Sequence, residues 1–358
     1  MDARGVQTRS MRQGRGYAVI RMGGVSFRLW KRGLVAYACL IVGIIAVSFI
    51  SITIGDYDVG MGQLLASFTN SADDRLAAYF VMDVRLPRIV AGILVGAALG
   101  VSGAVFQTLS GNPLGSPDII GFTKGSATGA LVAIILFSGG SAAAAAGAVV
   151  GGLLTAGVVY GLSWNKGAPG YRLVLVGIGA GAALGAVNAL LVVKAPLATA
   201  QTAVHWMAGS LNASLWREVA ITGVALAALI AIVISRGREL NLFPYGDAVA
   251  AGLGARTERS RFILMFTGVM LTAIATSLSG PISFVALVAP HVIKKITHGA
   301  GASLFGAALT GAFLVVSSDL VARRIIAPDE LAVGVVTGSF GGVYLILLLV
   351  TEWRKRGR

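Results

Sequence analysis

Long uncharged runs alternate with short charged segments along most of the chain. Six such runs cover residues 34–54, 89–117, 125–165, 173–193, 262–293 and 331–351. A helix needs roughly 20 apolar residues to cross about 30 Å of hydrocarbon, so several runs hold one span and the longest hold two. The pattern therefore predicts an all-α polytopic membrane protein. It excludes a transmembrane barrel, because barrel strands alternate apolar and polar residues over about 10 positions.

Glycine and proline residues divide the longer runs. They interrupt the pattern at residues 111–117, 139–140 and 280–281, where a helix is expected to end. With these breaks the pattern predicts ten transmembrane helices, at residues 34–54, 89–108, 117–137, 142–162, 172–193, 218–235, 262–280, 282–297, 303–322 and 332–351.

Segment 195–216 is uncharged but differs from the ten predicted spans. It carries His205, Trp206 and Trp216 together with several amide and hydroxyl side chains. Because tryptophan is enriched at the membrane interface, we expect a short amphipathic helix on the outer surface rather than an eleventh span. Five spans then lie on either side of this segment, which is compatible with two inverted halves.

The composition agrees with a membrane protein. Hydrophobic residues make up 56% of the 358 residues and charged residues only 12%, and the mean hydropathy is +0.82. A soluble domain carries about 25% charged residues. The 49 glycines suit helices that pack through small residues. The single cysteine, Cys39, excludes an intrachain disulfide and a cysteine metal cluster.

The formal net charge is +14, and its distribution indicates an orientation. The basic residues lie in short segments beside the apolar runs, which favours positive loops on one membrane side over nucleic-acid binding. Ten spans with both ends in the cytoplasm place 22 of the 29 Lys and Arg residues on the cytoplasmic side. We therefore expect a basic, largely disordered cytoplasmic arm at residues 1–33, a ten-helix transmembrane domain at 34–351 and a basic cytoplasmic tail at 352–358.

Few residues point to catalytic chemistry. No GxxxxGK[ST] phosphate loop occurs, so the chain is not expected to bind and hydrolyse ATP by itself. The histidines are scattered and predict no metal site, and no directly bound cofactor is expected. Only Asp118 and Asp319 are acids close to a span, whereas a proton-driven carrier usually needs buried carboxylates. An ion-coupled secondary transporter with inverted repeats is therefore the second hypothesis.

Blocks of sequence carry a family resemblance. They are Arg85-Leu-Pro-Arg88, NPLGSPD at 112–118, LSGPISFVALVAPH at 278–291 and DELAVGVVT at 329–337. In order and spacing they resemble the iron-siderophore and cobalamin (FecCD-type) permeases, the transmembrane subunits of type II ATP-binding-cassette (ABC) importers. The resemblance covers about residues 34–351. Within the family, AGSLN at 208–212 and GGVYL at 341–345 look most like a ferric-enterobactin permease subunit.

The resemblance implies a ten-helix subunit that performs no covalent chemistry. It implies a second permease subunit, identical or different, two cytoplasmic ABC ATPase subunits that use ATP and Mg, and an extracytoplasmic siderophore-binding protein. The implied cargo is an iron(III)-siderophore chelate, with catecholate, hydroxamate, haem and cobalamin left open. The implied location is the cytoplasmic (inner) membrane of a bacterium.

The resemblance also assigns roles to charged and glycine residues. Arg85, Arg88 and Arg323 are expected to dock the binding protein, and the alternative is that they anchor to lipid headgroups. The loop at 236–261 is expected to hold the coupling helix that contacts the ATPase. Within that loop the expected coupling residues are Gly246, Asp247, Gly252, Gly254, Arg256, Glu258 and Arg259.

Two further features could belong to the translocation pathway. Four glycines lie along one face of the second span, where close helix packing is the alternative role. Lys124 departs from the family, which usually has a small or uncharged polar residue there. We expect it either to extend to the interface from the cytoplasmic end of its helix or to contact an anionic ferric siderophore. The four glycines are Gly92, Gly96, Gly100 and Gly103.

Overall fold

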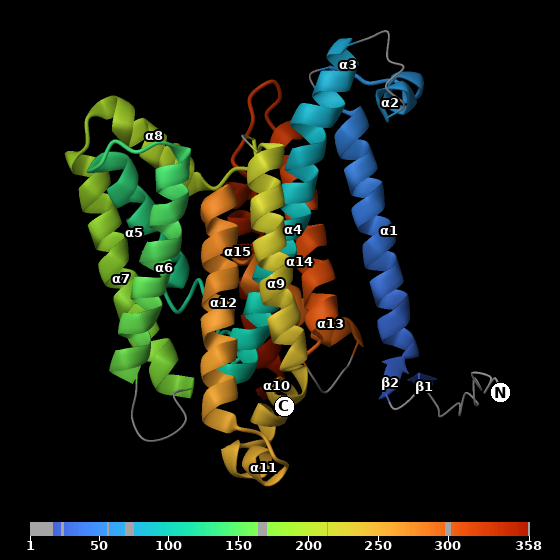
Figure 1. Cartoon of the computed structure of the whole chain (residues 1–358), viewed down its shortest axis with the longest axis vertical. Helices are drawn as coiled ribbons and strands as arrows, with labels where there is room; N and C mark the ends of the chain where they lie inside the picture. The colour runs from blue at the N-terminus through green and yellow to red at the C-terminus, as the bar shows by residue number, and fades with distance from the viewer. Residues whose placement is uncertain are drawn as a thin grey trace, which may run out of the picture.

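The protein is a bundle of long helices in a computed structural model (Figure 1). Residues 1–16 of the predicted arm and 357–358 of the predicted tail lie outside the described part of the chain. The structure describes residues 17–22, 25–55, 57–68, 75–163, 170–212, 214–297 and 302–356.

Each of the ten predicted spans contains a helix. Seven helices of the described chain are long and apolar enough to cross a membrane, whereas α5, α13 and the apolar part of α15 (Val333–Leu348) are shorter. Helix α4 continues a preceding helical segment that begins at Arg75, well before the predicted start of that span. The ten helices are α1 (Lys31–Thr53), α4 (Leu86–Ser110), α5 (Phe122–Ile135), α6 (Ser141–Ser163), α7 (Gly170–Lys194), α9 (Trp216–Ser235), α12 (Thr257–Ser279), α13 (Val285–Thr297), α14 (Leu304–Arg324) and α15 (Val333–Arg356).

Short helices connect the long ones. The predicted surface segment contains helix α8, but Trp216 does not belong to it and instead opens α9. The short elements are α2 (Met61–Phe68), α3 (Arg75–Tyr79), the π-helical η1 (Phe80–Arg85), α8 (Leu197–Ala208), α10 (Gly237–Leu242), the 3₁₀-helical η2 (Phe243–Tyr245) and α11 (Asp247–Gly252).

The predicted N-terminal arm contains a β-hairpin. Strands β1 (Tyr17–Met22) and β2 (Val25–Trp30) pair in antiparallel register from Tyr17 opposite Trp30 to Met22 opposite Val25. The expectation of a largely disordered arm is therefore wrong for these twelve residues. The sequence signal was present, because a Gly-Gly pair between two runs rich in β-branched and aromatic residues is typical of a hairpin.

Small residues allow the central helices to pack closely. Helix α4 lies inside the bundle and contacts α9, α12, α13 and α14. Helices α5 and α6 meet at Gly129 and Gly147, where a methyl group on either residue would overlap the backbone of the other helix. Lipid offers no hydrophobic driving force for association, so such close backbone contact supplies much of the packing energy.

Two breaks within the bundle explain why α5 and α13 are short. Gly121, with φ of 86°, precedes α5, and Phe284, with φ of 67°, precedes α13. Asp118 lies between them: its carboxylate accepts a hydrogen bond from the Thr123 hydroxyl at 2.6 Å and one from the Phe284 amide at 3.1 Å. The predicted helix starts at 117 and 282 were therefore several residues too early.

The two ends of the bundle carry different elements. The start of α1, the C-terminal end of α15 and helix α11 lie at one end, which is the lower end in Figure 1. Helices α2, α3 and α8 lie at the opposite, upper end. We call these the α11 end and the α8 end.

Candidate docking, coupling and transport sites

A π-helical turn leads into the first candidate site at the α8 end. In η1 the Leu86 amide bonds to the carbonyl oxygen of Val81, five residues earlier. Pro87 follows in the first turn of α4. Proline has no N–H and its ring crowds the carbonyl four residues before it, so a widened turn lets the helix continue through this position. Arg85 and Arg88, on either side of the proline, are both buried.

Arg88 forms the centre of an ion-pair network. Its guanidinium lies 2.9 Å from Asp319 on α14 and 3.0 Å from Glu330 in the segment before α15. The side chains of Arg88 and Asp319 are 5% and 4% exposed, whereas that of Glu330 is 31% exposed. Arg88 also donates a hydrogen bond to Asn212 Oδ1 at 3.1 Å. The network joins the start of α4, the end of α14 and the segments before α9 and α15.

Arg323 and Arg85 also have partners inside the protein. Arg323 Nε lies 3.3 Å from Asp319 Oδ2, and its Nη2 donates a hydrogen bond to Ser51 Oγ at 2.8 Å. Arg85 donates hydrogen bonds to two backbone carbonyl oxygens at the end of α1 and just after it. These contacts hold the end of α1 against η1 and α14.

The three predicted docking arginines thus lie in one region, but each of them is bonded to other residues of the same chain. The headgroup-anchor alternative is wrong for Arg85 and Arg88, because both side chains are buried. Docking stays a prediction, and it requires Glu330 to leave Arg88 before an acidic partner residue can approach. Sequence reasoning did not select three exposed arginines in terminal helical turns at the same end, which are Arg75, Arg217 and Arg324.

The predicted coupling loop folds into short helices at the α11 end (Figure 1). Gly246 and Gly254, on either side of α11, have φ of 94° and 85°, which favour glycine. The Ala255 amide bonds to the carbonyl oxygen of Ala250 at 3.0 Å and closes the C-terminal turn of α11. The sequence therefore specifies a short helix with a glycine-dependent turn at each end.

A salt bridge fixes α11 to the start of α12. Arg261 Nη2 lies 2.6 Å from Asp247 Oδ1. The same guanidinium lies 5.1 Å from the centre of the Phe243 ring, within the range of a cation–π contact. Asp247 therefore has a positioning role in this loop, and a force applied to α11 reaches a membrane-length helix directly.

Three exposed apolar side chains at and beside α11 form what we call the apolar stripe. Val249 lies in α11, Tyr245 ends η2 just before it and Leu253 directly follows it. Gly252 ends α11 with open space where a side chain would be. The remaining residues predicted for coupling are exposed beside the stripe: Arg256, Glu258 and Arg259.

The four glycines of α4 have a packing role. All four are buried. A methyl group on Gly96 or Gly100 would overlap backbone atoms of α14, and one on Gly103 would overlap a backbone carbonyl of α13. One on Gly92 would lie 3.3 Å from the Leu211 side chain. Because these positions face other helices of the same chain, the geometry gives no support to a pathway role for them.

Lys124 lies apart from both sites, in the first turn of α5. That turn is the end of α5 farther from α8, because Ile134 and Ile135 at the other end pack in one cluster with Trp206 of α8, but it does not lie at the end of the bundle. Gly121, just before α5, packs against Gly177 and Gly181 near the middle of α7, so α5 begins within the bundle. The Lys124 side chain is exposed.

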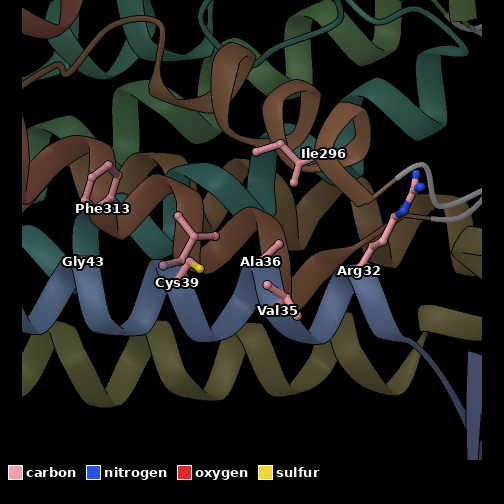
Figure 2. Close-up of a pocket in the computed structure, with 8 residues that line it drawn as sticks. Arg32, Val35, Ala36, Cys39, Gly43, Ile296 and Phe313 are labelled. Carbon is pink, nitrogen blue, oxygen red and sulfur yellow. The ribbon is translucent and has the colours of Figure 1, made fainter. Parts of the chain in front are cut away.

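A separate pocket of about 700 Å³ lies between α1, α13 and α14 (Figure 2). Cys39, Ile296 and Phe313 contribute to its largely apolar wall, and Arg32 lies at one end. It contains none of the predicted site residues. Among the described residues, no group of three or more His, Cys, Asp and Glu side chains is placed to hold a metal ion.

Together these features define a polytopic membrane protein whose helical bundle exposes the short helix α11 at one end. The chain belongs to the FecCD transport family, whose model matches residues 17–351. This confirms the resemblance that the sequence blocks carry. The protein is therefore the multi-pass permease subunit of a bacterial ABC importer, and it is not the ATPase subunit.

Individual relatives agree with this family. The chain is 43% identical over 323 residues to the ferric enterobactin transport system permease protein FepG of Escherichia coli (strain K12), covering 90% of this chain and 96% of FepG. It is 32% identical over 331 residues to the iron(3+)-hydroxamate import system permease protein FhuG of Bacillus subtilis (strain 168), covering 89% and 98%. A solved metal-chelate type ABC transporter in an inward-facing conformation matches with a TM-score of 0.77 and 26% identity, covering 88% and 98%.

Proposed function

We propose that this permease carries an iron(III)-siderophore chelate into the cytoplasm, and that the chelate is a catecholate. The observation that carries this proposal is the 43% identity to FepG over 90% of the chain, because FepG is named for ferric enterobactin. The relative FhuG is named for iron(3+)-hydroxamate, so the family name alone leaves the siderophore class open. Cobalamin and haem are the competing cargoes.

In this proposal the α11 end faces the cytoplasm and holds two ABC ATPase subunits in a dimer of permeases. Support comes from the exposed apolar stripe of Tyr245, Val249 and Leu253, which offers a partner an apolar contact beside a charged rim. ATP and Mg act in the ATPases. Their closure moves α11, and the Asp247–Arg261 salt bridge transmits that movement to α12.

The α8 end receives the extracytoplasmic binding protein. Its exposed arginines, Arg75, Arg217 and Arg324, offer positive charge to an acidic partner surface. Arg88 and Arg323 lie beneath them in the ion-pair network, so docking and the internal arrangement of α4 and α14 are linked. Both chain termini then lie on the cytoplasmic side.

The test is uptake by proteoliposomes that contain the complete importer. The binding protein and radio-iron-labelled ferric tris-catecholate are placed outside, and Mg-ATP inside. We expect uptake that needs ATP and persists when a protonophore removes the proton gradient. Uptake driven by an ion gradient without ATP would instead support the secondary-transporter alternative. Matched assays with ferric tris-hydroxamate, haem and cobalamin identify the cargo class.

A further inference from the structure

The Lys124 side chain lies along the middle of α7. A methyl group on Gly181 would be 3.7 Å from Lys124 Cδ, and one on Gly185 would be 3.8 Å from Lys124 Nζ. Gly185 lies well inside α7 (Gly170–Lys194). At about 1.5 Å per residue, the ammonium is roughly 14 Å from one end of α7 and roughly 23 Å from the other. It therefore lies at the depth of the hydrocarbon.

No acid of the described chain neutralises this ammonium. The ion pairs formed by the described residues do not include Lys124. The acid nearest in sequence, Asp118, already accepts hydrogen bonds from Thr123 and Phe284. Charged side chains at this depth almost always face the bundle interior or a water-filled cavity. Lys124 is exposed on this subunit, so we expect the surface around it to face water in the assembled transporter.

A small polar cluster holds the Lys124 backbone in place. Asn188 of α7 is buried, and its Nδ2 donates a hydrogen bond to the Lys124 carbonyl oxygen at 3.4 Å. Thr128 Oγ1 lies 2.9 Å from the same carbonyl oxygen and 2.7 Å from Asn188 Oδ1. These contacts use the backbone of Lys124 and leave its ammonium available. Gly181 and Gly185 have no side chains to fill the space beside it.

We propose that Lys124 contacts the cargo in the translocation pathway and favours anionic ferric chelates over neutral ones. This inference rests on the proposed function, namely the import of ferric chelates between two permease subunits. The tris-catecholate complex of iron(III) carries net negative charge, whereas the tris-hydroxamate complex is neutral. A single ammonium attracts only the first of these strongly, because the Coulomb energy depends on the product of the two net charges.

The test compares Lys124 variants in the complete importer in proteoliposomes, with ferric tris-catecholate as the probe. Lys124→Gln, which keeps most of the side-chain length but removes the charge, should lower the uptake rate about tenfold or more. Lys124→Arg, which keeps the charge, should retain most of the uptake. Basal ATPase activity and binding-protein capture should stay unchanged in both variants. Lys194→Gln, at the end of α7, is the matched control and should transport normally.

A second variant, in which the positive charge is moved from position 124 to position 185, distinguishes loss of charge from a structural defect. A methyl group on Gly185 would meet only Lys124 Nζ, so a side chain can be added there. Adding Gly185→Lys to Lys124→Gln should therefore restore part of the uptake. Wild-type uptake by Lys124→Gln would overturn the proposal, as would equal losses in the Gln and Arg variants. If the wild-type importer itself moves no ferric chelate, the proposed function fails instead.

Discussion

Arg88 of α4 and Asp319 of α14 form an ion pair of 2.9 Å in which both side chains are almost wholly buried. Removing one partner of a buried pair leaves an uncompensated charge and typically costs about 3–5 kcal/mol. We predict that Arg88→Met lowers the free energy of unfolding of the detergent-solubilised protein by about that amount. The measurement is a denaturant or thermal unfolding curve followed by tryptophan fluorescence.

Arg324 provides the control for this prediction. It ends the same helix that carries Asp319, but its side chain is exposed. Exposed charges contribute only about 0–1 kcal/mol, so Arg324→Met should change stability little. Equal stability of the two single variants would contradict the buried network.

The second prediction concerns the turn that follows α11 in the predicted coupling loop. Gly254 has φ of 85°, a conformation that β-branched residues resist. Gly254→Val should therefore distort the exit from α11 and abolish ATP-driven uptake, while binding-protein capture at the α8 end persists. The control is Gly237→Val in the same loop, where the nearest atom to an added methyl group is 3.9 Å away. Normal uptake by Gly254→Val would argue against α11 as the coupling element.

The third prediction concerns the contact between α4 and α14. A side chain on Gly96 would overlap the backbone of Gly311. Overpacking of this kind typically costs about 1–3 kcal/mol, and backbone atoms cannot rotate away, so Gly96→Val should reach at least that range. The readouts are the yield of monodisperse protein and its unfolding curve. Gly157→Val on α6, where an added methyl group meets nothing within 4 Å, should behave as wild type.

The fourth prediction concerns orientation. Reporter fusions after Arg32, after Gly254 and at the C-terminus should all report the cytoplasm. Fusions near Asp74 and Ala327 should report the outside. The reason is the distribution of basic residues: without Lys124, which lies within the bundle, 21 are on the side assigned to the cytoplasm and 7 on the other. An external signal from the C-terminal fusion would contradict a topology with an even number of spans.

The helices could be predicted from sequence because the bilayer sets a minimum apolar length. Eight of the ten spans therefore lie largely within the six uncharged runs, and the other two, at 218–235 and 303–322, each carry one acid. Charge at Asp83 and Arg85 made the first half of the Arg75–Ser110 helix look like a loop. That charge is accommodated because Arg85 is satisfied by backbone carbonyl oxygens of the α1 end, which lie about 30 residues earlier in the chain.

The site residues were harder to predict than the helices. The sequence identifies Arg88 as unusual but cannot supply its partner Asp319, which lies 231 residues away. It also suggested that Lys124 extends to the membrane interface from the cytoplasmic end of its helix. The positive φ of Gly121 delays the start of α5 and moves Lys124 into the bundle. Local sequence patterns identify unusual charged residues such as Arg88 and Lys124. The depth of such a residue in the membrane and the identity of its ion-pair partner depend on tertiary packing.

The carboxylate of Asp118 has a mechanical consequence. It accepts hydrogen bonds from the Thr123 hydroxyl on α5 and from the Phe284 amide next to α13. These two groups are 161 positions apart in the chain, so the carboxylate links the starts of the two helices. Lys124 follows Thr123 directly. A tilt or shift of the α13 start must therefore carry the ammonium with it, or break a hydrogen bond to Asp118. In the proposed pathway, the position of the Lys124 charge therefore depends on how α5 and α13 are arranged.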